Sequence, residues 1–149
     1  MDQSKINRKA KDIIDSNIYL SLATTDKEKP WIAPLYYCKD GRYNFYFISQ
    51  PSSVHIKHLD HSNEVAFAIF DSHQPEGQGN GVQGYGKVEL LEGDAITEGL
   101  KYYSTSFIDL KAESLQSPSP YRLYKMTPDK VYILDSEADV DKRIEVFLF

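Results

Sequence analysis

Residues 31–49 are WIAPLYYCKDGRYNFYFIS, two runs rich in β-branched and aromatic residues that are separated by Asp40-Gly41. Such runs favour β-strands. An Asp-Gly pair best supplies the positive φ angles of a tight hairpin turn. The segment therefore predicts two antiparallel strands, Trp31–Lys39 and Tyr43–Ser49, joined by that turn.

The next residues, 49–61, are SQPSSVHIKHLDH, and they predict the end of a strand followed by the start of a helix. Ser52 or Ser53 is of the residue type that caps such a helix. Near the N-terminus, apolar residues recur at helical spacing with charges between them, which predicts an amphipathic helix. The predicted helices are Ser4–Ser16, Val54–Asp60 and Ala95–Phe107, the last capped by Asp94.

Further strand patterns lie on both sides of the hairpin. EVAFAIF is a continuous apolar run, typical of a buried strand. Gly84 and Gly86 indicate a bulge, a bend or a close approach within their strand, and Pro128-Asp129-Lys130 predicts the turn of a second hairpin. The further predicted strands are Ile18–Thr25, Glu64–Phe70, Gly81–Leu91, Tyr121–Thr127, Val131–Asp135 and Ile144–Phe149.

Seven or eight strands joined mostly by short turns, with two or three helices, predict one mainly β (α+β) domain over residues 1–149. The short turns argue against a parallel sheet, whose strands need long crossovers. We therefore expect an antiparallel β-barrel of about six to eight strands with peripheral helices.

Composition and motifs narrow the function. The net charge of −5 argues against a nucleic-acid partner, which would need a basic face to neutralise phosphates. The first residues contain no long apolar run, so we expect no membrane span, no signal peptide and a cytoplasmic location. Cys38 is the single cysteine, which excludes an intramolecular disulfide and a cysteine-based zinc site. No G-x-G-x-x-G lies between a strand and a helix, and there is no P-loop, G-x-S-x-G or H-E-x-x-H motif.

The segment 49–61 gathers the residues best suited to chemistry. Serine hydroxyls and basic side chains stand beside the free amides of a predicted helix start, where anions bind. A phosphate monoester is the natural guest. The alternative is that the serines only cap the helix while the histidines and Lys57 face water. Three histidines spaced by three residues diverge around a helix, so we expect no metal site.

The order of these segments resembles the pyridoxamine 5′-phosphate oxidase-like, FMN-binding split-barrel family. The resemblance spans about residues 5–135 and rests on IYLSLATT, the hairpin, SSVHIKHL, EVAFAIF, GVQGYGKVELLEG and YRLYKMTPDKVYILD. It implies a split barrel, a homodimer, and FMN in two clefts between the subunits. The flavin would carry the redox chemistry, so no catalytic side chain is assigned. The cofactor-binding residues that the resemblance implies are Ala33, Pro34, Leu35, Tyr36, Ile48, Ser49, Gln50, Ser53, His55, Lys57 and Gln83.

The chain also departs from this family's pattern. Oxidases of the family commonly have Arg near Ala33 and Ser-Arg-Lys where this chain has Ser53-Val54-His55, and they end in an Arg-Leu-Ala-Pro type tail where this chain ends DKRIEVFLF. We therefore expect negligible oxidation of pyridoxamine 5′-phosphate. A flavoprotein oxidoreductase acting on an unknown small molecule is the leading hypothesis. The alternatives are a non-catalytic module that binds or senses flavin or haem, and an interaction protein. Tyr36 and Tyr85 are candidates for contacts in the cleft, or for core and interface packing.

Overall fold

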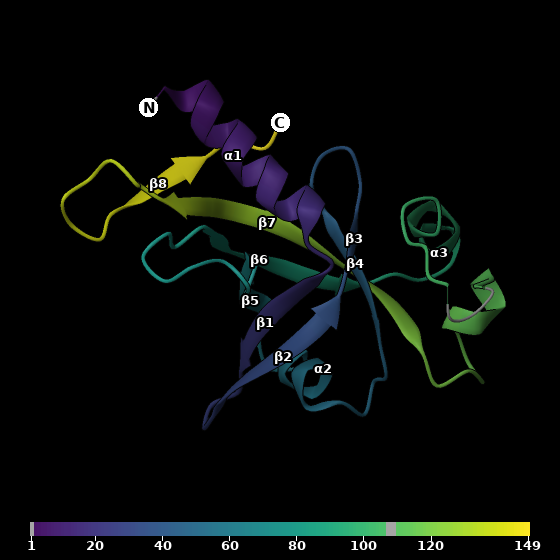
Figure 1. Ribbon diagram of the computed structural model, residues 1–149. Helices are drawn as coiled ribbons and strands as arrows, with labels where there is room; N and C mark the ends of the chain where they lie inside the picture. The colour runs from purple at the N-terminus through teal and green to yellow at the C-terminus, as the bar shows by residue number, and fades with distance from the viewer. Residues whose placement is uncertain (1, 107–109) are drawn as a thin grey trace.

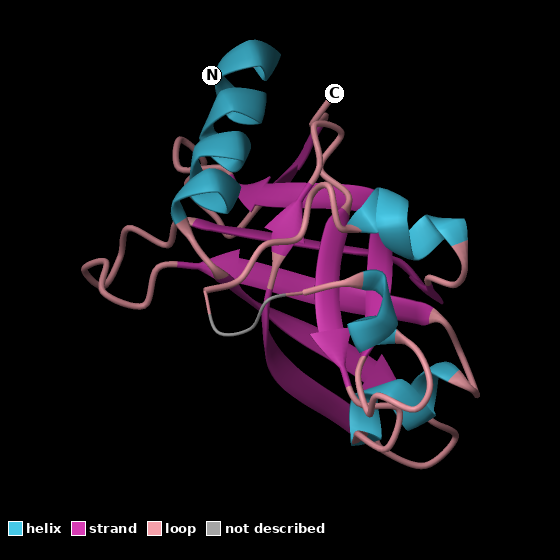
Figure 2. Cartoon of the chain, turned by 90° about the vertical axis from the view of Figure 1, so that its right-hand side faces the viewer, coloured by secondary structure: helices cyan, strands magenta, loops and turns pink. Residues whose placement is uncertain are grey.

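An antiparallel eight-stranded sheet curls into a half-barrel, with helices at its ends and on one side (Figures 1 and 2). This computed structural model describes residues 2–106 and 110–149. The strand order is β2-β1-β5-β6-β7-β4-β3, and β8 also pairs with β7. The elements in chain order are α1 (Gln3–Ser16), β1 (Tyr19–Thr25), β2 (Pro30–Tyr36), β3 (Cys38–Lys39), β4 (Phe45–Ser49), α2 (Val54–Leu59), β5 (Glu64–Phe70), β6 (Gly81–Leu90), α3 (Asp94–Gly99), the 3₁₀ helix η1 (Ala112–Leu115), β7 (Arg122–Leu134) and β8 (Arg143–Val146).

The main core fills the concave side of the sheet. Strands β1 and β5 alternate buried and more exposed residues, so every second side chain enters this core. Its aromatic centre joins β4 to β7 and β5: the rings of Phe47 and Tyr124 stack at 5.4 Å, and those of Phe45 and Phe67 lie 5.5 Å apart. Helix α1 covers one end of the barrel with its apolar stripe, and α2 lies at the opposite end (Figure 1).

A second, smaller core lies where α3 and η1 pack against β7, on the other side of β4 and β7 from the main core. Because β4 is buried on both faces, its residues alternate between the two cores. The residues of the second core are Tyr46, Leu91, Ile96, Tyr103, Leu115 and Leu123. Among the described residues, no helix has the length and apolar character needed to cross a bilayer.

The expected fold class is confirmed, but the second predicted hairpin is wrong. Residues 122–134 form the single strand β7, and Pro128 lies within it rather than in a turn. On one side, β4 pairs with residues 122–126 and β8 with 131–134, so residues 127–130 lie in the gap between two partners. On the other side, the register with β6 shifts between Tyr85 and Gly86, opposite Pro128. A proline, which has no N–H to donate, is tolerated at such an irregularity.

Three further local predictions were wrong. The predicted strand Trp31–Lys39 is divided at Tyr37 into β2, which pairs with β1, and the short β3, which alone pairs with β4. The turn after β3 has its positive φ at Tyr43 and not at Gly41, because the Asp40 carboxylate builds the turn by accepting from the amides of Arg42 and Asn44. Helix α3 ends at Gly99 and its N-cap is Gly93, not Asp94. Residue 107, the predicted end of that helix, lies outside the described residues.

The glycines of β6 generate the first prediction. A Cβ atom on Gly86 would overlap the carbonyl oxygen of Thr127 and lie 2.9 Å from the Cα of Pro128. Gly86→Ala should therefore lower the free energy of unfolding by about 1–3 kcal/mol or more, as overpacking does. Gly41→Ala is the matched control, since nothing lies within 4 Å of its Cβ position. Urea denaturation of both variants checks this, and equal stabilities would contradict it.

Candidate functional site

Ser49 and His55 form a buried pair where β4 ends and α2 begins. The Ser49 hydroxyl lies 2.8 Å from Nε2 of His55, and both residues are buried. Burial, with the neighbouring His58 as a second cause, lowers the pKa of His55 below its ordinary value of 6.5. The imidazole is therefore neutral at neutral pH. It orients the Ser49 hydroxyl and supplies no positive charge.

The neighbouring strand, β7, carries a permanently charged residue, Arg122. Arg122 is the cross-strand partner of Ser49 in the β4–β7 pair, so the two side chains lie on the same face of the sheet. Its Nη1 donates to the carbonyl oxygens of Ser119 (2.5 Å) and Tyr121 (2.7 Å). The positive charge of Arg122 also acts to lower the pKa of the nearby Tyr124, although burial outweighs it and raises that pKa. Sequence reasoning missed Arg122 because only the strand register brings it to Ser49.

The other residues of the predicted phosphate segment point elsewhere. The Ser53 hydroxyl donates to the carbonyl oxygen of Gln50 at 2.7 Å and does not cap α2. Gln50 and Lys57 are exposed, and Lys57 lies on the helix face opposite the buried His55. Helix α2 has only six residues, which makes its dipole a weak source of positive potential. The structure thus joins Ser49 to His55 by a hydrogen bond and sets Arg122 opposite Ser49 on the next strand, with its guanidinium bound to Ser119 and Tyr121. These residues are called the Ser49 cluster, and the exposed Lys57 lies outside it.

His58 fastens α2 to the rest of the barrel. Its Nδ1 lies 3.0 Å from the Thr24 hydroxyl of β1, and its Nε2 lies 3.6 Å from Oδ2 of Asp26, in the turn after β1. Backbone amides of Glu28 and Lys29 bind the same carboxylate and lower the pKa of Asp26. In residues 2–106 and 110–149, no three side chains of metal-ligating type cluster together.

The second predicted region is β2, an edge strand. Ala33 is buried and Leu35 packs against the main core, whereas Pro34 is exposed on the convex face. Tyr36 ends the strand and packs with Ile48 against the second core. Elements β2 and α2 are in contact, so β2 passes near the helix that carries His55.

The convex face of β2, β1, β5 and β6, here called the outer face, is apolar and carries small residues at its centre. Ile32 and Tyr85 are 65% and 45% exposed, and between them lies a shallow hollow of about 430 Å³. Exposed large apolar groups around a flat centre are typical of a contact surface. The convex side chains that line the hollow are Ser21, Ala23, Ile32, Ala66, Ala68, Gln83 and Tyr85.

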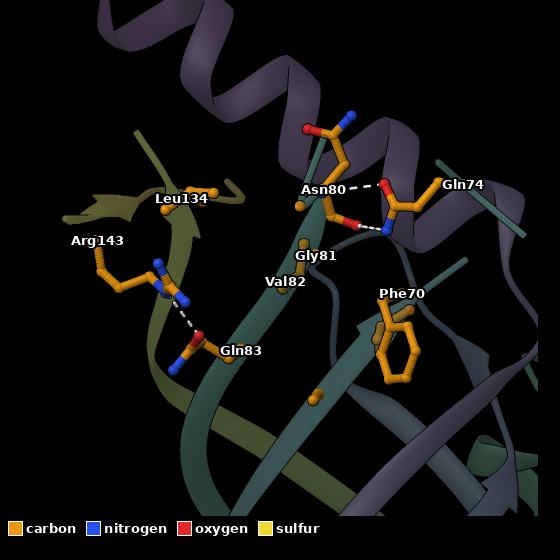
Figure 3. A pocket seen from close by; sticks show the side chains of 11 residues that line it. Phe70, Gln74, Asn80, Gly81, Val82, Gln83, Leu134 and Arg143 are labelled. Atoms are coloured by element: carbon orange, nitrogen blue, oxygen red, sulfur yellow. Dashed lines mark hydrogen bonds between the residues drawn. The ribbon is translucent and has the colours of Figure 1, made fainter. Parts of the chain in front are cut away.

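Gln83 lies on this outer face, three strands away from β2. Its Oε1 accepts a hydrogen bond of 2.8 Å from Nε of Arg143, on β8, beside a hollow of about 260 Å³ (Figure 3). The exposed Phe70 ring stands on the other side of the hollow, and paired hydrogen bonds between Gln74 and Asn80 hold the loop above it. Within one chain, Gln83 is therefore separated from the other predicted cofactor residues.

The lowered pKa of His55 predicts a pH dependence of stability. Below about pH 6.5 the unfolded chain binds a proton that the folded protein resists. The folded state therefore pays no penalty at His55 above about pH 6.5. The free energy of unfolding falls as the pH decreases from there towards the folded-state pKa of His55. His55→Gln, which keeps a hydrogen-bonding group for Ser49, should reduce the decline in unfolding free energy measured between about pH 7.5 and pH 5.

The exposed His73 provides the control for this measurement. His73→Gln should leave the pH dependence of wild type unchanged, because that side chain is almost fully exposed. Identical pH dependences for wild type and His55→Gln would show that His55 is not held neutral by burial.

Comparison with known proteins places this geometry in a family. The family model for pyridoxamine 5′-phosphate oxidase matches residues 6–135. No curated protein sequence matches the chain. A heme binding protein from Mycobacterium smegmatis superposes with a TM-score of 0.72 at 18% identity, over 93% of this chain and 57% of its own.

Two further solved structures agree over nearly their whole length. General Stress Protein 26 from Bacillus anthracis gives a TM-score of 0.68 at 19% identity, covering 94% of this chain and 98% of its own. A putative pyridoxamine 5′-phosphate oxidase from Listeria innocua gives 0.62 at 16% identity, covering 86% and 97%. At such identities these likenesses establish the fold alone. With the family model matching most of its length, the chain belongs to the pyridoxamine 5′-phosphate oxidase-like family of split barrels.

Proposed function

We propose that this protein is a cytoplasmic flavoprotein oxidoreductase that binds FMN between the two subunits of a homodimer. The cross-strand position of Arg122 opposite Ser49 carries the proposal, because it sets a permanent cation on the strand next to a preoriented hydroxyl. The family match supports the same cofactor, which its members commonly bind. Cys38 is a free thiol, as is usual in a reducing compartment.

The residues of the Ser49 cluster fit the phosphate of FMN. A phosphate monoester needs hydrogen-bond donors and at least one positive charge. Ser49 would accept from Nε2–H of His55 and donate its own proton to the phosphate, and Arg122 would offer guanidinium N–H groups other than those bound to Ser119 and Tyr121. This assignment replaces the sequence-based expectation that His55 or Lys57 supplies the positive charge.

The apolar ring system of FMN would lie along β2, the edge strand that is in contact with α2. Its edge faces no strand among the described residues, so its backbone groups are available to a ligand. Bound FMN would supply hydride or electron transfer, and the protein would bind, orient and desolvate the reactants. Gln83 and Arg143 of the second subunit would complete the cleft, because they lie on the outer face through which we expect the subunits to meet.

A haem-binding module is the second candidate, favoured by the likeness to the M. smegmatis heme binding protein. His55 and His58 are both buried and already hydrogen-bonded, so neither is placed to serve as an axial ligand without rearrangement. The absorption spectrum of the purified protein separates the two candidates. A flavin spectrum supports the proposal, and a haem spectrum alone would favour the module.

The Arg122 assignment predicts a phosphate-specific loss of affinity. Removing a charged contact costs about 1.5–3 kcal/mol, or roughly tenfold to hundredfold in affinity. Arg122→Gln should therefore weaken FMN by that factor and leave riboflavin, which lacks the phosphate, nearly unchanged. Titration of both ligands followed by flavin fluorescence measures this.

Lys57→Gln provides the comparison, because that side chain lies outside the cluster. We expect it to change FMN affinity less than Arg122→Gln does. A larger effect at Lys57 would restore the phosphate site expected from the sequence, and equal losses for both flavins would exclude Arg122 as the phosphate ligand.

The outer face predicts the homodimer. A charged side chain at its centre must be desolvated if two copies pack there. Ala66→Arg should therefore convert the dimer to a monomer at micromolar concentration, as measured by light scattering, whereas Ala95→Arg, at an exposed position of α3, should not. A monomeric wild-type protein would contradict the shared-cleft model.

A further inference from the structure

A pocket lined by tyrosine lies beside the end of β2, outside the Ser49 cluster. It has a volume of about 370 Å³, at the small end of the range for ligand pockets. Its walls come from three separate segments: the start of β1, the end of β2, and the chain that follows α3. The lining residues are Ile18, Tyr19, Tyr36, Tyr103, Thr105 and Ser106.

The three tyrosine rings form a connected wall. Tyr36 packs edge-to-face against Tyr19 with ring centroids 6.1 Å apart, and against Tyr103 at 5.8 Å. The Tyr36 hydroxyl donates to the carbonyl oxygen of Ser104 at 3.0 Å and accepts from the Cys38 thiol at 3.7 Å. Tyr36 and Tyr103 are thus held in place without a ligand, which lowers the entropic cost of binding a ring against them.

The wall is electrically neutral. The hydrogen bond with Cys38, followed by burial, raises the pKa of Tyr36, and burial raises that of Tyr103 to about 12. Both phenols therefore stay protonated over the physiological range. Of the described residues that line the pocket, none has a charged side chain. A phosphate or carboxylate entering it would lose its hydration without gaining a cation.

We propose that this pocket binds a neutral aromatic compound of one or two fused rings, without a phosphate group, as the substrate of the protein. Tyrosine walls attract such rings through stacked and edge-to-face contacts. Tyr36 belongs both to this pocket and to the strand along which the flavin ring is proposed to lie, so a bound ring would be next to the flavin. The role as substrate rests on the proposed function, whereas the binding itself does not.

A matched pair of probes tests the preference: 2-naphthol and 2-naphthyl phosphate, titrated calorimetrically against the full chain with and without FMN. We expect 2-naphthol to bind, and its phosphate ester to bind at least tenfold more weakly. Tyr19→Ala, at a largely exposed position, should weaken 2-naphthol about twofold to tenfold. Tyr102→Ala should not, because that ring stacks on Tyr46 outside the pocket.

A charge introduced into the pocket tests its location independently. Ile18 is 60% exposed at the pocket, so Ile18→Lys should fold normally and raise the affinity for 2-naphthyl phosphate at least tenfold. Val140→Lys, at an exposed site elsewhere, should leave it unchanged. The proposal is overturned if wild type fails to bind 2-naphthol, if it binds the ester as tightly, or if the pocket variants behave like their controls.

Titration with FMN tests the proposed flavoprotein function separately from ligand binding in the tyrosine pocket. Arg122→Gln should weaken FMN and leave 2-naphthol binding intact. If wild type binds 2-naphthol with this preference and no FMN, the pocket stands while the flavoprotein function and the substrate role fall. If FMN binds and 2-naphthol does not, the flavoprotein function is supported and the pocket proposal is rejected.

Discussion

Glycine at positions 84 and 86 lets β6 approach β7 more closely than any side chain would permit. At both positions an added Cβ would overlap a carbonyl oxygen of β7, that of Lys130 or that of Thr127. This approach, together with the register shift opposite Pro128, accommodates the bend of the long strand β7. The bend matters because β7 pairs with β6 along one side and with β4 and then β8 along the other. The two halves of the barrel, and both of its cores, therefore meet on this one strand.

The candidate phosphate site follows from the same arrangement. Pairing of β4 with the first residues of β7 sets Ser49 opposite Arg122, and the short helix α2 returns His55 to the Ser49 hydroxyl. The buried histidines of α2 serve to position the helix and the hydroxyl, since His58 joins the helix to Thr24 and the turn at Asp26. In the proposed site the positive charge comes from Arg122, on a strand about seventy residues later in the chain, and not from the start of α2.

The two regions proposed for ligands differ in their physical character. The Ser49 cluster combines a hydroxyl with a guanidinium, which suits an anion. The tyrosine pocket presents rings centred on Tyr36, whose hydroxyl is hydrogen-bonded to Ser104 and Cys38, and this suits an uncharged ring. Strand β2 is in contact with α2, which carries His55, and its last residue, Tyr36, lines the pocket. In our proposal, a flavin along β2 would therefore lie close to both regions.

The local sequence by itself determined the strands with strong apolar patterns, the amphipathic helix α1 and hence the antiparallel barrel, because burial at period two or at helical spacing is encoded locally. It also singled out Ser49 and His55, since a strand end followed by a helix start is visible in the chain. Tertiary structure alone decided that residues 122–134 form one strand, because Pro128 is tolerated only where β4 and β8 leave a gap. It likewise decided that His55 is buried, which holds its imidazole neutral, and that Arg122 is the cross-strand partner of Ser49. Charge state depends on burial, and cross-strand partners depend on strand register. The residues adjacent in the sequence therefore determine neither property.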